Sequence, residues 1–183
     1  MEVERYFSGR YEGETLKIVS TNKHTVCPII EEHHGYGTCP PNAVYYFAVI
    51  EGGTVTAAFT WNVPVAGVAK MLGKGALCLT RMVAKPKSER SLRHISKPLR
   101  FSIKRMIDRD KYPILVTYSD LSMGHDGYTY KCAGFRMHGR GEGKMIVTSE
   151  GKRKASVSSG KSVSLEDGDR IVKVDLIRWV HGM

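Results

Sequence analysis

The sequence lacks the features that would place a protein outside the cytosol. None of its apolar runs approaches the roughly 20 residues that a membrane-spanning helix needs. The first ten residues, MEVERYFSGR, are charged and contain no apolar core of a secretory signal. Only four of the 183 residues are cysteines, with no CxxC pair, which excludes a disulfide-dense scaffold. We therefore expect a cytosolic protein with reduced thiols.

Acidic residues are the scarcer charged class. The chain has 18 Asp and Glu against 28 Lys and Arg, a formal net charge of +10. This excess favours an anionic partner: nucleic acid, a phosphorylated cofactor, or both. Charge alone does not exclude a protein that merely happens to be basic. The length suits one domain with its own core, with room for a small appendage.

Apolar periodicity predicts an α/β (α+β) fold around a central mixed sheet. An antiparallel half with a β-hairpin is followed by a βαβ half, with helices on both faces of the sheet. An amphipathic helix is expected over residues 98–110, with Leu99 and Ile103 on its apolar face. Shorter helices are expected over 22–32, with Pro28 near the start or breaking it, and over 128–133. Strands are predicted at residues 15–19, 44–50, 54–61, 75–84, 113–118, 144–149 and 171–180, with a Gly-containing connection at 64–74 and a Gly-rich turn at 140–143.

The stretch from Lys111 to Arg136 organises the rest of the chain. A buried strand, PILVTY, ends at Ser119 and Asp120, and a Gly-containing loop then leads into a short helix. Open α/β sheets place their chemistry where a strand ends in polar residues and feeds a helix. An ordinary solvated connection, with Asp120 as a helix cap, fits the spacing equally well.

A second candidate site is the basic loop over residues 85–97, before the amphipathic helix. Free N–H groups and the dipole at a helix start favour phosphate. The layout resembles the GNAT acyltransferases, in which a loop of pattern Q/R-x-x-G-x-G/A binds coenzyme A. Arg93 keeps the leading Arg, and Arg90 offers a second register, but Ser96 and Pro98 replace the small residues. A basic loop on a solvated face is the alternative. The resemblance implies a donor site made of Arg81, Met82, Val83, Arg90, Arg93, Ser96, Lys97 and Tyr130.

A more specific resemblance covers roughly residues 1–137. The segments YSD, GHDG and YK in the central stretch are similar to the Mom family of Mu-like phages. So are MEVERYFSGRYEGETLKIV, CPIIEEHHGYGTCPPNAVYYFAVIEG, FTWN, LTRMVA and HISKPLR. The resemblance implies a GNAT-like catalytic domain over residues 1–140, with 141–183 as a basic, β-rich extension that completes or flanks the sheet. It also implies a phage enzyme that adds a carbamoylmethyl (glycinamide-type) group to N6 of adenine in DNA and so blocks host restriction.

The resemblance also implies the catalytic residues. They are His33, His34, Tyr36, Ser119 and Asp120, and which histidine works with Tyr36 stays open because the family has a single His-Tyr pair. Asp120 could accept the amine proton or hold the amine by hydrogen bonds, with an imidazole as base. Ser119 and Tyr36 could bind the base edge or protonate a leaving group. A flipped base could stack on Tyr128 or Tyr130.

A metal site is the alternative for the histidine loop. Cys27, His33, His34 and Cys39 offer soft and borderline ligands. Their spacing, Cys-x5-His-His-x4-Cys, matches no common zinc site, so we expect reduced thiols and assign no metal ligand.

Double-stranded DNA is the expected acceptor, and no membrane partner is expected. The donor is an acyl-CoA or an aminoacyl carrier such as a charged transfer RNA, in the cytoplasm of an infected or lysogenic host. The oligomeric state stays open, a dimer included. Two other functions compete: a GNAT-fold acyltransferase on a small amine or protein lysine, and a catalytically inactive DNA-binding module.

Cations that could contact phosphate, or simply face solvent, are Arg100, Lys104, Arg105, Arg109, Lys111, Lys152, Arg153, Lys154, Lys161 and Lys173.

Overall fold

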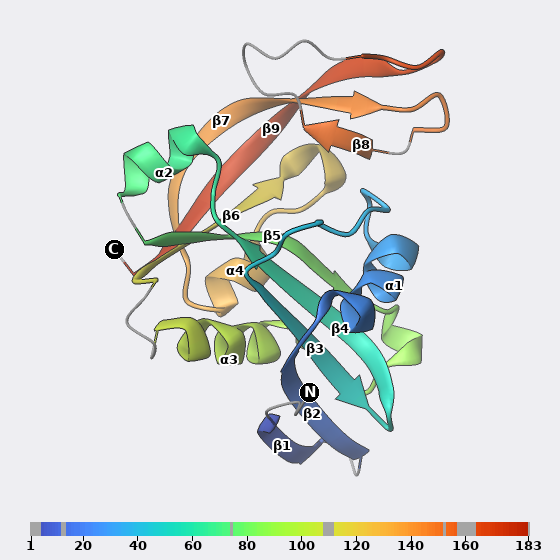
Figure 1. Cartoon of the computed structure of the whole chain (residues 1–183), viewed down its shortest axis with the longest axis vertical. Helices are drawn as coiled ribbons and strands as arrows, with labels where there is room; N and C mark the ends of the chain where they lie inside the picture. Colours follow the sequence, from blue (N-terminus) through green and yellow to red (C-terminus); the bar gives the residue numbers. More distant parts are fainter. Residues whose placement is uncertain are drawn as a thin grey trace.

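The computed structural model describes residues 5–11, 14–73, 75–107, 112–151, 153–156 and 164–182. Within these residues nine strands form one sheet in the order β1-β2-β3-β4-β5-β6-β9-β7-β8 (Figure 1). The strands are β1 (Arg5–Tyr11), β2 (Glu14–Thr21), β3 (Tyr45–Glu51), β4 (Thr54–Asn62), β5 (Ala76–Ala84), β6 (Ile114–Asp120), β7 (Arg136–Val147), β8 (Arg153–Ser156) and β9 (Arg170–His181). The helices are α1 (Lys23–His33), α2 (Ala66–Leu72), α3 (Ser96–Ile107) and α4 (Tyr128–Cys132), with short 3-10 turns η1 (Lys87–Glu89) and η2 (Leu121–Met123).

The pairing confirms the predicted α/β class and mixed sheet. Neighbouring strands from β1 to β5 pair antiparallel, β5 and β6 pair parallel, and β9 returns antiparallel between β6 and β7. Helix α3 is the crossover that a parallel pair requires. No helix within the described part of the chain is both long and apolar enough to cross a membrane.

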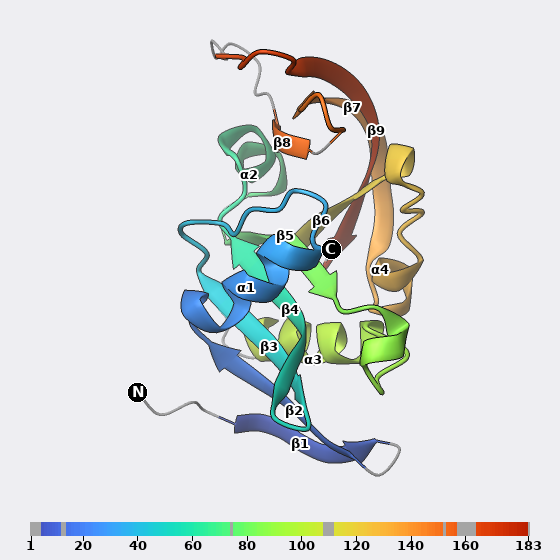
Figure 2. The same cartoon turned by 90° about the vertical axis from the view of Figure 1, so that its right-hand side faces the viewer.

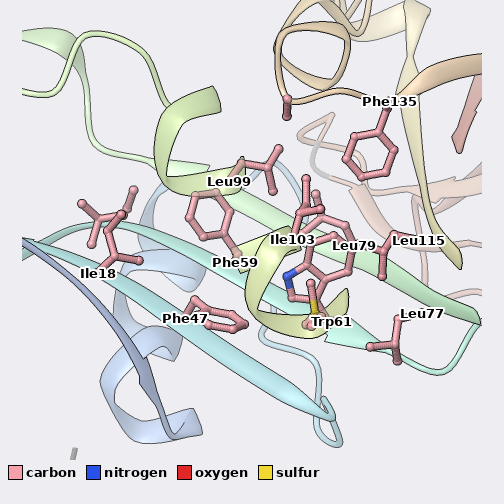
Figure 3. Packing of buried hydrophobic residues seen from close by; sticks show 14 of the residues in the cluster. Ile18, Phe47, Phe59, Trp61, Leu77, Leu79, Leu99, Ile103, Leu115 and Phe135 are labelled. Carbon is pink, nitrogen blue, oxygen red and sulfur yellow. The ribbon is translucent and has the colours of Figure 1, made fainter. Parts of the chain in front are cut away.

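Helices cover both faces of the sheet. On one face, Leu99 and Ile103 of α3 pack with Phe59 and Trp61 of β4, two of the large aromatic side chains of the main core (Figure 3). Helix α4 adds Tyr130 to the same cluster. On the other face, α1 packs Val26, Ile29 and Ile30 against β2, β3, β4 and β5, and α2 packs Leu72 and Val68 beside β5, β6 and β9.

A β-bulge at Thr80 sets which side chains of β5 face which helix. Arg81 pairs with Thr60 and Leu79 pairs with Trp61, so Thr80 has no partner of its own on β4. Its hydroxyl bonds instead to Asn62 Oδ1 at 2.6 Å. The extra residue shifts the alternation. Leu79 and Met82 therefore both pack in the α3-side core, whereas Arg81 and Val83 lie on the α1 side.

The parallel ladder between β5 and β6 is short. It joins Ala76–Cys78 to Ile114–Val116 and then ends, although both strands continue. Past that point the Thr117 hydroxyl donates to the carbonyl oxygen of Leu79 at 3.4 Å. The ends of the two strands, which carry Arg81 and Asp120, are thus not paired with each other.

Three local predictions were wrong. Helix α1 continues through Pro28, because the Asn22 cap and three buried apolar side chains offset the one hydrogen bond that proline removes. The connection 64–74 contains helix α2, whose apolar residues Val68 and Leu72 cover one end of the sheet. The expected turn at 140–143 is instead part of the continuous strand β7.

The glycines of β7 serve packing rather than a turn. Gly139, Gly141 and Gly143 alternate, so they share one face of the strand. A Cβ at Gly143 would lie 2.8 Å from Cδ1 of Leu176, and one at Gly139 would lie 3.2 Å from a guanidinium nitrogen of Arg178. Side chains of the neighbouring strand β9 occupy the space that Gly139 and Gly143 leave, whereas nothing lies within 4 Å of the Cβ position at Gly141. A Gly-rich segment of this kind resembles a turn in sequence, although it folds as a strand.

Candidate active site

Asp120, the last residue of β6, is held by two neighbours. Its Oδ1 accepts hydrogen bonds from the backbone N–H and hydroxyl of Ser122 at 3.0 and 2.5 Å. Its Oδ2 pairs with the guanidinium of Arg153 from β8. Burial alone would raise the pKa of Asp120, but the hydrogen bonds from Arg153 and Ser122 outweigh it and the pKa lies below its ordinary value. The carboxylate is therefore ionised at neutral pH.

His34 and Tyr36 follow the C-terminus of α1. The His34 Nδ1 accepts the backbone N–H of Tyr36 at 3.1 Å, so the neutral imidazole carries its proton on Nε2. Burial lowers the pKa of His34 to about 4, with help from the positive charge of Arg81 and from His125. At neutral pH His34 is thus an uncharged hydrogen-bond donor through Nε2. The two rings stack with centroids 5.4 Å apart.

Arg81 joins this loop to the sheet. Its guanidinium carbon lies 4.4 Å from the ring centroid of Tyr36, and its Nε donates to the Thr38 carbonyl oxygen at 3.2 Å. Burial raises the pKa of Tyr36, opposed by Arg81 and Arg153, so the phenol stays protonated at neutral pH. Arg153 also hydrogen-bonds to the Tyr36 side chain, which links the histidine loop to Asp120.

Four of these residues come from three distant segments and form one group. His34 and Tyr36 come from the loop after α1, Arg81 from β5, and Asp120 from β6. A Cβ on Gly35 would lie 3.7 Å from Cε of Met123 in η2, so this loop packs against the turn that follows Asp120. We call His34, Tyr36, Arg81, Asp120 and Arg153 the polar cluster.

A disulfide closes the histidine loop. Cys27 in α1 and Cys39 after the loop are bonded to each other, and 12 positions separate them. The expectation of reduced thiols is therefore wrong for this pair, whereas Cys78 and Cys132 are free. Sequence spacing could not reveal the bond, because the turn after α1 is what returns the chain to Cys27. The bond also removes both sulfurs from the alternative metal site.

Two predicted catalytic residues lie apart from the polar cluster. The Nε2 of His33 lies 3.5 Å from the Oε1 of the exposed Glu32. Ser119 faces the opposite side of the sheet from Asp120, as alternation along β6 requires. It is 2% exposed, and its hydroxyl accepts the indole N–H of Trp179 at 2.8 Å. The structure therefore associates His34, rather than His33, with Tyr36, and gives Ser119 a buried structural contact.

A pocket of about 750 Å³ lies between the basic loop and α4. Its walls include three of the predicted donor-site residues, Arg90, Arg93 and Ser96, and it extends to Tyr128 and Thr129. The guanidinium of Arg90 is engaged by the loop itself, since it donates to the carbonyl oxygens of Lys85 and Leu92. Basic and hydroxyl-bearing side chains line it at the start of helix α3, a suitable place for a phosphate group.

Glu51 anchors the loop that forms this pocket. It is 5% exposed, and its carboxylate accepts the backbone N–H and hydroxyl of Ser91 at 2.6 and 2.7 Å. The Thr56 hydroxyl donates to the same carboxylate at 2.9 Å. Burial tends to raise the pKa of Glu51, but these hydrogen bonds lower it overall. A buried carboxylate thus joins the β3–β4 hairpin to the basic loop.

The other predicted donor residues lie in different places. Val83 is buried under α1, and Met82 packs in the α3-side core. Tyr130 packs against Phe135, with ring centroids 6.0 Å apart, and hydrogen-bonds to Thr117. Burial raises the pKa of Tyr130. Arg81 belongs to the polar cluster, and the exposed Lys97 is not part of the pocket wall.

The basic tail is largely paired with acidic residues. Arg153 pairs with Asp120, Lys154 with Glu166 and Asp169, and Lys173 with Glu142. Arg109, Lys111, Lys152 and Lys161 lie outside the described residues. Arg153 is the site residue that sequence reasoning missed, since it appeared there only among the cations that could contact phosphate or face solvent. No local pattern marks it, since only the fold of the C-terminal strands brings it to Asp120.

Comparison with known proteins agrees with this geometry. A model of the Mom protein family matches residues 15–172, so the similarity continues well past residue 137, where the sequence resemblance ended. The matched range includes β7, β8 and the start of β9. No curated relative matches the chain.

Solved N-acetyltransferase structures share the fold at low identity. The ribosomal-protein-S18-alanine N-acetyltransferase of Escherichia coli has a TM-score of 0.55 at 14% identity, covering 90% of this chain and 92% of that one. A putative acetyltransferase from Acinetobacter baylyi has a TM-score of 0.57 at 11% identity, covering 93% and 94%. The spermidine/spermine N-acetyltransferase of Vibrio cholerae has a TM-score of 0.55 at 8% identity, covering 91% of both chains. These matches confirm the predicted GNAT-like fold.

Proposed function

The chain belongs to the Mom protein family, and we propose that it transfers a carbamoylmethyl (glycinamide-type) group to N6 of adenine in double-stranded phage DNA. The product would resist host restriction nucleases, and the reaction would take place in the host cytoplasm. The observation that carries the proposal is the polar cluster. The segments behind the family resemblance bring His34, Tyr36, Arg81 and Asp120 together.

The acceptor amine sets the chemical demand. The N6 lone pair is delocalised into the purine ring, so the amine is a weak nucleophile and needs accurate positioning. In the transfer, a bond forms between N6 and a carbon of the transferred group, the bond between that carbon and its carrier breaks, and N6 loses a proton. After attack, N6 is positively charged and strongly acidic. Even a carboxylate of low pKa can then accept the proton.

Asp120 fits that role. Its Oδ1 already accepts two hydrogen bonds from Ser122, but Oδ2 has Arg153 as its partner and keeps a lone pair that could accept an amine hydrogen. His34 is less suited to act as base, because its Nδ1 is occupied and its pKa is about 4. The hydrogen-bond donors of the polar cluster instead suit a negative charge: the His34 Nε2–H, the Tyr36 hydroxyl and Arg81 could stabilise oxygen on the reacting donor group.

The pocket beside α3 is the proposed donor site. Its basic and hydroxyl-bearing walls fit the phosphates of an acyl-CoA, or of an aminoacyl carrier such as a charged transfer RNA. The exposed Tyr128 in its wall offers an aromatic face for a nucleobase. We leave Tyr130 out of this role, because its ring packs against Phe135 and Trp179.

A second candidate is an N-acyltransferase acting on a small amine or a protein amine. It is favoured by the fold alone, since the solved neighbours are N-acetyltransferases of such substrates. A catalytically inactive, basic DNA-binding module is a further alternative. It would use the same net charge of +10 without any need for the ionised Asp120.

The test is nucleoside mass spectrometry of plasmid DNA from cells that express the chain. We expect a modified adenosine with the wild type and none with Asp120→Asn, which keeps the shape of the side chain but not its charge. Both proteins should bind DNA with similar, salt-dependent affinity. Tight coenzyme A binding with no affinity for DNA would support the small-amine enzyme instead. If both proteins bind DNA equally and neither plasmid contains modified adenine, the result would support the binding module.

A further inference from the structure

We propose that Arg153 is a positioning residue of the active site, which holds the Asp120 carboxylate and the Tyr36 hydroxyl in a single arrangement. The inference rests on the proposed function for the identity of the reaction. The pairing of the three side chains does not depend on it.

Strand β8 reaches Asp120 by folding over the sheet. In the sheet order, β9 and β7 separate β8 from β6, so the two strands are not neighbours. Figures 1 and 2 show β7 and β9 as a long curved pair with β8 on its concave side. Arg153 pairs opposite Val147 of β7, and its side chain meets Asp120 across that concave side. The C-terminal strands thus supply a wall of the site.

Arg153 contacts several acceptor groups of the site at once. The Arg153 and Asp120 side chains are only 10% and 15% exposed. One terminal nitrogen of the guanidinium meets Asp120 Oδ2, and the other donates to the Ser122 hydroxyl at 2.7 Å. The same side chain hydrogen-bonds to Tyr36. A planar guanidinium can hold several acceptors in fixed directions at once, which a lysine ammonium cannot do as well.

Two titratable side chains interact with Asp120: Arg153 from β8, which pairs with its carboxylate, and Tyr36 from the loop after α1. Farther out, Arg81 from β5 interacts with Tyr36 and His34, His125 from the loop before α4 interacts with His34, and Arg178 from β9 interacts with Tyr118 of β6. Burial pushes the pKa of Asp120 up, and the hydrogen bonds of Arg153 and Ser122 bring it down. Without Arg153, burial would be opposed mainly by Ser122, so a larger fraction of Asp120 would be protonated.

The experiment compares Arg153→Gln with the wild type in two readouts. The first is the titration midpoint of the Asp120 carboxyl carbon, followed by NMR in the purified protein without substrate. The second is the pH profile of the rate of adenine modification. Arg170→Gln is the matched control, since Arg170 is an exposed arginine on the paired strand β9.

In Arg153→Gln, we expect the Asp120 midpoint to rise by at least about one pH unit, which is a tenfold change in its protonation equilibrium. The acid limb of the rate profile should move by the same amount, and kcat should fall while KM for DNA stays nearly constant. Arg170→Gln should leave both readouts unchanged. Arg153→Lys keeps the positive charge and loses the planar guanidinium, so its Asp120 midpoint and its rate profile should lie between those of the wild type and Arg153→Gln. If Arg153→Gln does not fold, the comparison is made with Arg153→Lys.

Three outcomes separate the possibilities. An Asp120 midpoint that is equal in wild type and variant overturns the inference, whatever the activity. A midpoint that shifts while the rate profile does not also overturns it, because the pairing would then be structural only. A shifted midpoint in a protein whose wild type modifies no adenine upholds the pairing and refutes the proposed function.

Discussion

The guanidinium of Arg81 lies 4.4 Å from the ring centroid of Tyr36, and this contact joins strand β5 to the histidine loop. The bulge at Thr80 makes it possible, because it turns Arg81 toward α1 instead of α3. Arginine is suited to the position, since its planar group stacks on the ring while Nε donates to the Thr38 carbonyl oxygen. The contact therefore fixes the distance between the sheet and the Tyr36 hydroxyl.

The first prediction concerns this contact. Tyr36→Leu removes the ring and should lower the free energy of unfolding by about 0.5–2 kcal/mol in cation–π energy beyond the lost apolar burial. Tyr36→Phe keeps the ring and should leave the stacking intact, so the energy coupled to Arg81 should persist. A double-mutant cycle that combines Tyr36→Leu with Arg81→Met, measured by urea denaturation, isolates the coupling energy of the two side chains. Zero coupling between Arg81 and Tyr36 would contradict the prediction.

The sequence predicts the sheet well and the site only in part. Strands such as 54–61 and the helix beginning near Pro98 follow from local periodicity, which the core enforces. Asp120 could be singled out only through the family resemblance of the segments YSD, GHDG and YK, because its place at a strand end fits a helix cap equally well. Arg153 could not, since its role depends on a curved hairpin that returns to β6 from the far edge of the sheet. Such long-range placement leaves no trace in residue spacing.

The two neighbouring histidines show the same limit. Sequence spacing left His33 and His34 equivalent, but the last turn of α1 separates them. His34 lies at the C-cap, where its ring can bond to the Tyr36 N–H and meet Arg81, whereas His33 is still within the helix and lies near Glu32. A one-residue step along a helix end rotates a side chain by about 100°. Which of the two histidines reaches the site therefore depends on the residue at which α1 ends.

The second prediction concerns pH. The pKa of His34 is 6.5 in the unfolded chain and about 4 in the fold. Between these values the unfolded state binds more protons, so the native state loses stability as the pH falls from 6.5 toward 4, by up to about 1.4 kcal/mol per pH unit. His34→Asn, which keeps an acceptor for the Tyr36 N–H, should remove this slope.

The measurement is the free energy of unfolding in urea at intervals across that range. His181, whose pKa is also lowered by burial, is common to both proteins and cancels in the difference. If the wild type and His34→Asn lose stability in parallel as the pH falls, the buried neutral imidazole is not the cause of the loss.

The third prediction concerns the disulfide. Cys27 and Cys39 are 12 positions apart, and cross-linking a loop of that size stabilises a fold by about 3 kcal/mol. For a chain of this length, reduction should lower Tm by about 6–12 °C. It should also slow adenine modification, because the loop that carries His34 and Tyr36 would lose one of its anchors.

Thermal unfolding with and without dithiothreitol measures the effect. The double variant Cys27→Ser, Cys39→Ser should match the reduced wild type and no longer respond to the reductant. Cys132→Ser is the control, since that thiol is free and exposed and should leave the response as in the wild type. A wild-type Tm that is the same in both conditions would rule out a stabilising bond between Cys27 and Cys39.

The fourth prediction concerns Gly127, at the start of α4. Its φ is +79°, and a Cβ there would lie 2.2 Å from Cζ2 of Trp179. Gly127→Ala should therefore cost left-handed strain and also displace the indole that donates to Ser119. Gly53→Ala is a matched control, because Gly53 has a φ of +87° with nothing within 4 Å of the Cβ position. We expect a loss of about 1–2 kcal/mol for Gly53→Ala, from strain alone, and about 2–5 kcal/mol for Gly127→Ala, where overpacking adds to it. Urea denaturation followed by tryptophan fluorescence gives both values, and equal losses would mean that Trp179 yields to the added methyl without cost.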